Sequence, residues 1–136
     1  MKITVETTVK ASTARVWEAW TTPADIVQWN FASPDWCCPS ATFDARVGGT
    51  FGARMEAKDG SFGFDFGATI TKLEAPSLLE YGMAERTVQV SFTETPEGIQ
   101  VRETFDAEDE NPAEMQRQGW QAILDNFRLH VESTKG

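Results

Sequence analysis

A period-two pattern of apolar residues runs through the middle of the chain, from residue 40 to residue 105. Phe62, Phe64 and Phe66 form one of its rows, and strict alternation of this kind puts apolar side chains on one face of a strand. Short turn-forming segments, such as residues 58–60 (KDG), separate the rows. The pattern therefore predicts about six antiparallel strands that bury one face.

The flanking segments carry the signals of one more strand and three helices. Residues 3–9 alternate again and predict a first strand. Residues 12–20 and 22–30 predict two short helices, because each begins with a capping hydroxyl and the second has Pro23 at its first position. Residues 111–131 begin with Asn-Pro and continue with apolar residues at helical spacing, which predicts a long amphipathic helix.

These elements have one economical packing, in which a strongly curved antiparallel sheet wraps around the long C-terminal helix. We therefore expect an α+β helix-grip fold with two short helices after the first strand. The 136 residues suit one core, and no linker or repeat interrupts them. We expect a single domain over residues 1–136, with a cavity between sheet and helix.

Charge and hydropathy exclude several classes of partner. With 21 acidic and 12 basic residues the formal net charge is −9, which repels nucleic-acid phosphates. No run approaches the roughly 20 apolar residues that cross a bilayer, and the first ten residues lack the apolar segment of a signal peptide. We expect a soluble cytoplasmic protein, monomeric or homodimeric, that binds no nucleic acid and does not associate stably with membranes.

The potential metal ligands and nucleophiles are few. Cys37 and Cys38 are the only cysteines and His130 is the only histidine, whereas a structural zinc ion takes about four such ligands. A cysteine nucleophile also needs a base close by, and no histidine is near in sequence. We expect free thiols in a loop beside the cavity, a partly exposed His130, and no metal, cofactor or catalytic cysteine.

Five segments together resemble a known family. They are residues 15–20 (RVWEAW), 44–51 (DARVGGTF), 63–66 (GFDF), 103–105 (ETF) and 116–124 (QRQGWQAIL). In their order and spacing the chain is similar to homologues of the activator of the heat-shock-protein-ninety ATPase, in the START-like (SRPBCC) superfamily. The resemblance implies the helix-grip fold, a habit of holding lipids, polyketides or other apolar molecules in a central cavity, and a possible chaperone partner.

The candidate ligand-binding residues come from the inner rows, the terminal helix and one aromatic loop. The aromatic loop between the second short helix and the sheet supplies a possible rim or lid. The full set is Trp29, Phe31, Trp36, Phe51, Met55, Phe64, Phe66, Met83, Glu103, Trp120 and Leu124.

Glu103 is the unusual member, because alternation puts its carboxyl group in the buried row of Val101 and Phe105. A buried acid needs a partner or it stays protonated. The sequence leaves two interpretations: a structural acid, paired with backbone or arginine or turned outward by a bulge, and a ligand-recognition group. Gly119 raises a similar question inside the terminal helix, where close packing or room for a ligand would justify a glycine.

The leading functional hypothesis is non-catalytic binding of a hydrophobic or amphipathic small molecule, such as a lipid, polyketide or flavonoid-like compound, in the cavity. The absence of a convincing nucleophile and base pair motivates it. One alternative is an enzyme that uses Glu103 as general acid or base on a cyclic or polyketide-like substrate. Another is a co-chaperone-like regulator of a heat-shock chaperone ATPase that acts through its acidic surface.

Overall fold

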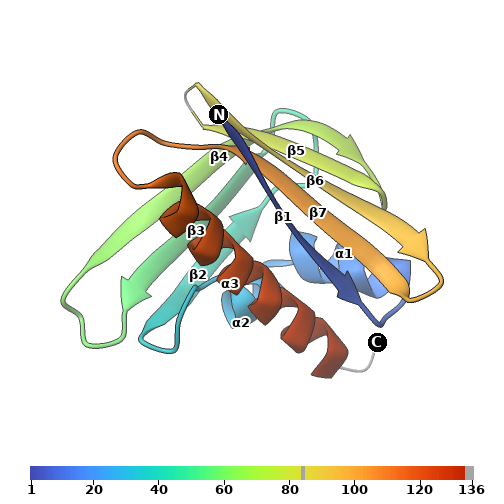
Figure 1. The fold of residues 1–136 in the computed structure, drawn as a ribbon, viewed down its shortest axis with the longest axis horizontal. Helices are drawn as coiled ribbons and strands as arrows, with labels where there is room; N and C mark the ends of the chain where they lie inside the picture. Colours follow the sequence, from blue (N-terminus) through green and yellow to red (C-terminus); the bar gives the residue numbers. More distant parts are fainter. Residues whose placement is uncertain (84, 134–136) are drawn as a thin grey trace.

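The fold is described from a computed structural model, which covers residues 1–83 and 85–133. Within these residues seven strands and three helices follow the order predicted from the sequence (Figure 1). Their bounds are β1 (Lys2–Val9), α1 (Thr13–Thr21), α2 (Pro23–Trp29), β2 (Trp36–Phe43), β3 (Thr50–Ala57), β4 (Gly63–Glu74), β5 (Leu78–Met83), β6 (Arg86–Thr95), β7 (Gly98–Asp106) and α3 (Ala113–Ser133).

All seven strands form one antiparallel sheet. The strand order is β1-β7-β6-β5-β4-β3-β2, so β2 to β7 form a meander and β1 adds to β7 at the far edge. Short turns join the meander strands, and Gly48, with φ of +89°, occupies the turn before β3. The predicted antiparallel meander and the turn at Gly48-Gly49 are confirmed.

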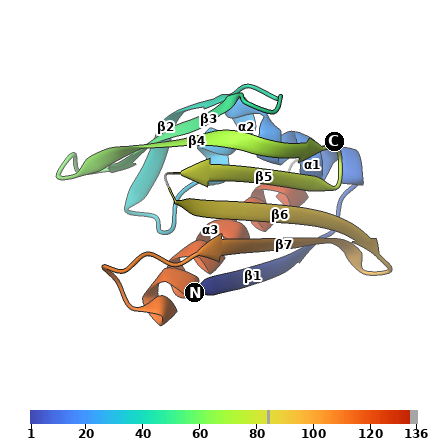
Figure 2. The same cartoon turned by 90° about the horizontal axis from the view of Figure 1, so that it is seen from above.

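The sheet curls around α3, which crosses its concave face diagonally (Figures 1 and 2). Register shifts between Cys37 and Ser40 in β2, and between Ile70 and Lys72 in β4, mark irregularities that increase strand bending. Helix α3 packs on the edge strand β1, and α2 packs on the opposite edge strand β2. The architecture is therefore the predicted helix-grip fold, with a helix against each sheet edge.

Alternation along the strands builds the core. In β7, Ile99, Val101, Glu103 and Phe105 are buried, while the residues between them are less so. Helix α3 contributes Leu124, Phe127 and Val131 to the same core. A smaller cluster of Cys38, Ala53 and Met55 lies at the β2–β3 end of the sheet.

Three aromatic rings hold the short helices to the long one. Trp20 of α1, Trp29 of α2 and Phe127 of α3 lie with ring centroids 4.9 Å apart in each pair. Trp29 Nε1 also donates a hydrogen bond to the backbone oxygen of Ala19 at 3.0 Å. Edge-to-face packing of this kind adds to the free energy of burial.

Two expectations about local structure need correction. Cys37 and Cys38 lie within β2, which begins at Trp36, so the preceding loop is shorter than predicted. Pro39 and the adjoining register shift interrupt the alternation that would have marked this strand. Cys38 is buried and Cys37 is half-buried, and both are free thiols.

His130 is not the partly exposed surface residue that was expected. Its Nε2 hydrogen-bonds Oδ1 of Asp25 at 2.8 Å, and both side chains are mostly buried. Arg15 donates to the same carboxylate through two nitrogens, at 2.8 and 3.1 Å. These three residues therefore connect α1, α2 and α3.

None of the helices within residues 1–83 and 85–133 is long and apolar enough to cross a membrane.

Candidate ligand-binding site

A cavity of about 200 Å³ lies between the concave face of the sheet and the first half of α3. Side chains from β3, β4, β5 and β7 form its sheet side, whereas α1, α2 and α3 close the other sides. The lining residues are Trp20, Trp29, Asn30, Phe51, Met55, Phe64, Phe66, Tyr81, Glu103, Trp120 and Ile123. Aromatic rings thus dominate the wall, as they do in many small-molecule sites.

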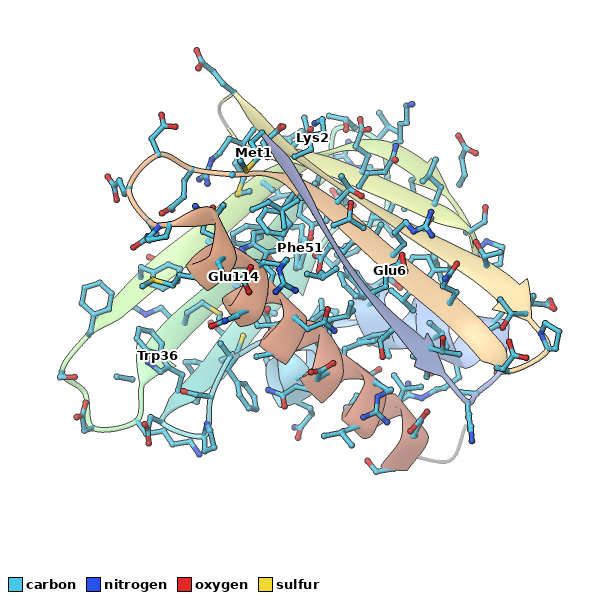
Figure 3. All side chains as sticks on the ribbon, in the orientation of Figure 1. Met1, Lys2, Glu6, Trp36, Phe51 and Glu114 are labelled. Atoms are coloured by element: carbon cyan, nitrogen blue, oxygen red, sulfur yellow. The ribbon has the colours of Figure 1, made fainter. Side chains whose placement is uncertain are left out.

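The structure brings most of the predicted site residues together on this wall. Those that line the cavity are Trp29, Phe51, Met55, Phe64, Phe66, Glu103 and Trp120. Phe51, labelled in Figure 3, belongs to β3 and lines the cavity together with Trp120 and Ile123 of α3. The inner face of the strands therefore lines the cavity as the alternation predicted.

Four other predicted residues lie elsewhere. Leu124 is fully buried in the main core, and Met83 packs against that core at the end of β5. Phe31 lies between α2 and α3, where its backbone oxygen accepts a hydrogen bond from Asn126 Nδ2 at 2.6 Å. Trp36 packs on Phe62 and Phe64 near the β3–β4 turn, outside the cavity wall (Figure 3).

Trp20, Asn30, Tyr81 and Ile123 complete the wall but were not predicted to do so. Tyr81 could have been found, because it occupies an apolar row as the only tyrosine of the chain. Trp20 and Ile123 belong to the apolar stripes of α1 and α3, and periodicity does not tell which stripe residue meets a cavity. Asn30 lies just after α2, and its Nδ2 points to the Met55 sulfur at 3.5 Å.

The cavity reaches the surface beside Phe64. This side chain lines the cavity and is nevertheless 44% exposed. Phe62, 61% exposed, and Trp36 pack against it and extend the apolar surface outward. We call Trp36, Phe62 and Phe64 the aromatic rim.

Glu103 is buried on the cavity wall among apolar side chains. Its register neighbours are Val5 on β1 and Val90 on β6, so both adjacent strands offer only apolar side chains. Within the described chain no hydrogen bond or ion pair involves its carboxyl group, so no arginine or backbone partner compensates for the burial. The side chain also stays on the inner face of β7, so no bulge turns it outward. Burial raises the pKa of Glu103 to about 8, so the carboxyl is protonated at neutral pH.

Tyr81 lies on the wall close to Glu103. Burial first, and then the negative charge of ionised Glu103, raise the pKa of Tyr81 well above its usual value. The nearby indole N–H of Trp20 partly opposes that rise, but it does not reach hydrogen-bond geometry, so within the described residues this buried N–H has no acceptor. The polar part of the cavity therefore consists of the Tyr81 hydroxyl, the Glu103 carboxyl, the Trp20 indole N–H and the Asn30 amide.

The two thiols differ in exposure, because Cys38 is buried and Cys37 is half-buried. Burial raises the pKa of the Cys38 thiol, whose sulfur donates weakly to the backbone oxygen of Ser40 at 3.4 Å. A raised pKa lowers the thiolate fraction and with it the nucleophilicity. Across residues 1–83 and 85–133 no three His, Cys, Asp or Glu side chains cluster in a way that would hold a metal ion.

Comparisons with known proteins agree with this architecture. The sequence model of the family described as Activator of Hsp90 ATPase homolog 1-like protein matches residues 10–132. A search of curated proteins finds no match.

Two similar solution structures share nearly half of the sequence. An AHSA1-like protein from Aeromonas hydrophila is 46% identical over 98% of this chain and 93% of its own, with a TM-score of 0.91. A protein from Cytophaga hutchinsonii is 45% identical over 97% of this chain and 92% of its own, with a TM-score of 0.83. A crystal structure from Nitrosomonas europaea, 14% identical over 98% of this chain and 95% of its own, shares the fold with a TM-score of 0.84.

Proposed function

Because this chain belongs to the Activator of Hsp90 ATPase homolog 1-like family, whose fold commonly holds hydrophobic ligands, we propose that it binds an apolar or amphipathic small molecule. The observation that carries the proposal is the aromatic-walled cavity between the sheet and α3. A ligand bound there removes apolar surface of both the ligand and the cavity wall from water, and this burial contributes about 25 cal/mol of favourable free energy per Å².

The volume of the cavity limits the size of that molecule. A dry cavity of about 150 Å³ lined by apolar side chains accommodates benzene. The present cavity of about 200 Å³ therefore suits a molecule of one or two rings, or a short chain. Longer ligands would extend through the mouth and lie on the aromatic rim.

A titration with two-ring aromatic compounds and medium-chain alcohols, followed by amide and indole chemical shifts, tests this proposal. Binding should shift the indole N–H signals of the cavity residues Trp20, Trp29 and Trp120. Ile123→Trp, which fills the cavity from α3, should abolish binding. The matched control is Leu129→Trp on the same helix, where the wild-type residue is 55% exposed. This variant should bind the compounds as the wild type does. Unchanged spectra with every compound would refute the proposal.

A second candidate function, catalysis with Glu103 as general acid or base, is favoured by one observation. The raised pKa of this carboxyl, about 8, lies close to neutral pH, where such groups exchange protons efficiently. A base at this position would exchange the α-protons of a bound ketone with solvent, which deuterium incorporation into 2-acetylnaphthalene measures. Exchange in the wild type and its loss in Glu103→Gln would support catalysis, and equal rates in both would exclude it.

A further inference from the structure

The polar groups on the cavity wall restrict the chemistry of the ligand. Eleven residues line the cavity, and the set contains no Lys, Arg or His among the described residues. An anionic head group would therefore find no counter-charge and would lie beside Glu103. Burying an unpaired anion costs far more free energy than the apolar body of a small molecule supplies.

The Glu103 carboxyl and the Tyr81 hydroxyl are available to a ligand, whereas the Asn30 amide is directed at the Met55 sulfur. Glu103 and Tyr81 both line the cavity, and within the described chain neither makes a hydrogen bond that meets normal geometry. Among the described residues, Trp20 Nε1 is the side-chain nitrogen or oxygen that is both sealed from solvent and without a hydrogen-bond partner. The carboxyl oxygens of Glu103 and the phenol oxygen of Tyr81 are not sealed in this way. Both therefore face the open volume.

Protonation decides what these groups offer. A carboxylic acid kept neutral by an apolar site donates a hydrogen bond through its O–H, as a tyrosine hydroxyl does. The residues beside Glu103 on β1 and β6 are valines, and Tyr81 on β5 is the titratable group facing it. The Trp20 indole N–H can only donate toward the Tyr81 oxygen, which leaves the Tyr81 proton for another acceptor.

We infer that the cavity selects neutral ligands with an apolar body of one or two rings and one hydrogen-bond acceptor, held by the Glu103 carboxyl and the Tyr81 hydroxyl. This inference rests on the proposed function and adds the class of ligand. A carbonyl or ether oxygen is such an acceptor. A ligand without it leaves both donors unsatisfied in an apolar site, which weakens binding.

Four compounds with one naphthalene body test the inference by calorimetry at pH 7: 2-methylnaphthalene, 2-acetylnaphthalene, 2-naphthoate and 2-naphthylmethylammonium. The neutral ketone should bind about tenfold more tightly than the methyl compound, because one satisfied hydrogen bond is worth about that factor. The anion and the cation should bind more weakly than the ketone.

Two variants assign the preference to the named groups. Tyr81→Phe keeps the ring contacts with Phe51 and Phe66, and Glu103→Leu keeps the side-chain bulk. Each should reduce ketone affinity several-fold and should not weaken binding of 2-methylnaphthalene, because that compound leaves the removed donor unsatisfied. In Glu103→Gln, which retains a donor, the ketone should still be preferred at pH 9.5, whereas the wild type should lose its preference as pH rises above 8.

The outcomes separate the two proposals. Equal affinity for ketone and methyl compound overturns this inference and leaves the proposed function standing. Tightest binding of the ammonium compound also overturns it, because Glu103 would then serve as a counter-ion in an aromatic cage. Failure of all four compounds to bind overturns the inference together with the proposed cavity function.

Discussion

At the scale of single residues, Glu103 shows the conflict between folding and function most clearly. Its register neighbours on both adjacent strands are valines, and no hydrogen bond or ion pair to the carboxyl occurs in the part of the chain that the structure describes. The folded protein therefore keeps this carboxyl group protonated up to about pH 8. Such an uncompensated group is retained where it serves a ligand, which agrees with the site proposed above.

This gives a prediction about stability and pH. The unfolded chain releases the Glu103 proton above its usual pKa near 4.5, whereas the folded protein keeps it until about pH 8. The folded state therefore binds the extra proton between these values, and its stability falls as pH rises through that window. Compared with Glu103→Gln, the wild type should lose on the order of 4 kcal/mol of unfolding free energy from pH 4.5 to pH 8.

Urea unfolding of both proteins at pH 4.5, 6 and 8 measures the difference. The two should be nearly equal at pH 4.5 and diverge progressively toward pH 8, with the variant more stable. Glu94→Gln, at an exposed position of β6, is the control and should follow the wild type at each pH. Parallel curves for wild type and Glu103→Gln would mean that Glu103 is ionised in the folded protein.

The inward direction of Glu103 could be predicted from alternation, but its lack of a partner could not. That property depends on Val5, which meets Glu103 only after a first strand from the other end of the chain pairs with β7. Periodicity identifies a face, whereas a partner is set by register between strands far apart in sequence. The same reason explains why Tyr81 escaped notice as a neighbour of the carboxyl.

At the scale of secondary-structure elements, each predicted strand and helix is present, because each had a strong period and a recognisable start. Ser12 Oγ, for example, accepts a hydrogen bond from the backbone nitrogen of Arg15 at 3.2 Å, as a helix cap does. The start of β2 was misplaced because Pro39 and a register shift break its pattern. Contacts between helices, such as that of His130 with Asp25, carry no local signal at all.

The Arg15–Asp25–His130 network predicts a measurable contribution to helix docking. Burial raises the pKa of Asp25, but hydrogen bonds from Arg15 and His130 outweigh it and lower the pKa overall. The lowered value means that this stabilisation is present above the usual pKa of Asp and lost as pH falls through the folded value. Asp25→Asn should destabilise the protein by about 1–3 kcal/mol at pH 7.

Thermal or urea unfolding checks this value, with Glu114→Gln as the control. Glu114 forms an exposed ion pair with Arg117 in the first turns of α3, and exposed pairs contribute little. The control should change stability by less than about 0.5 kcal/mol. A loss in Glu114→Gln as large as that in Asp25→Asn would contradict the importance assigned to the network.

Gly119 gives a second prediction at this scale. An added Cβ would meet no atom within 4 Å, so close packing does not explain this glycine in the middle of α3. Gly119→Ala should therefore stabilise the helix by about 0.5–1 kcal/mol. Gly98→Ala is the contrasting variant: at φ of +139° its Cβ would lie 2.5 Å from the Val9 oxygen, and unfolding should show destabilisation. A less stable Gly119→Ala would show that the helix needs the glycine for another reason.

At the scale of the whole molecule, the protein has one large apolar core and one small apolar cluster. The main core takes buried side chains from all three helices, from β1 and from β3 to β7, whereas Cys38, Ala53 and Met55 form a separate small cluster under β2 and β3. The aromatic rim lies at the end of the sheet near that small cluster, and its Phe64 also belongs to the cavity wall. The β2 edge adds only partly buried side chains to the main core, so less buried apolar surface stabilises this edge than the centre of the sheet.

Local opening should follow this division. Amide exchange should be fastest in β2 and β3 and slowest in β6 and β7, because opening needs less free energy where fewer apolar contacts are lost. A ligand that occupies the cavity touches Phe51, Met55 and Phe66 and should slow exchange in β3 and β4 in particular. Hydrogen exchange with and without 2-acetylnaphthalene measures both effects. Uniform exchange across the sheet, or ligand protection confined to β6 and β7, would show that the ligand enters by another route.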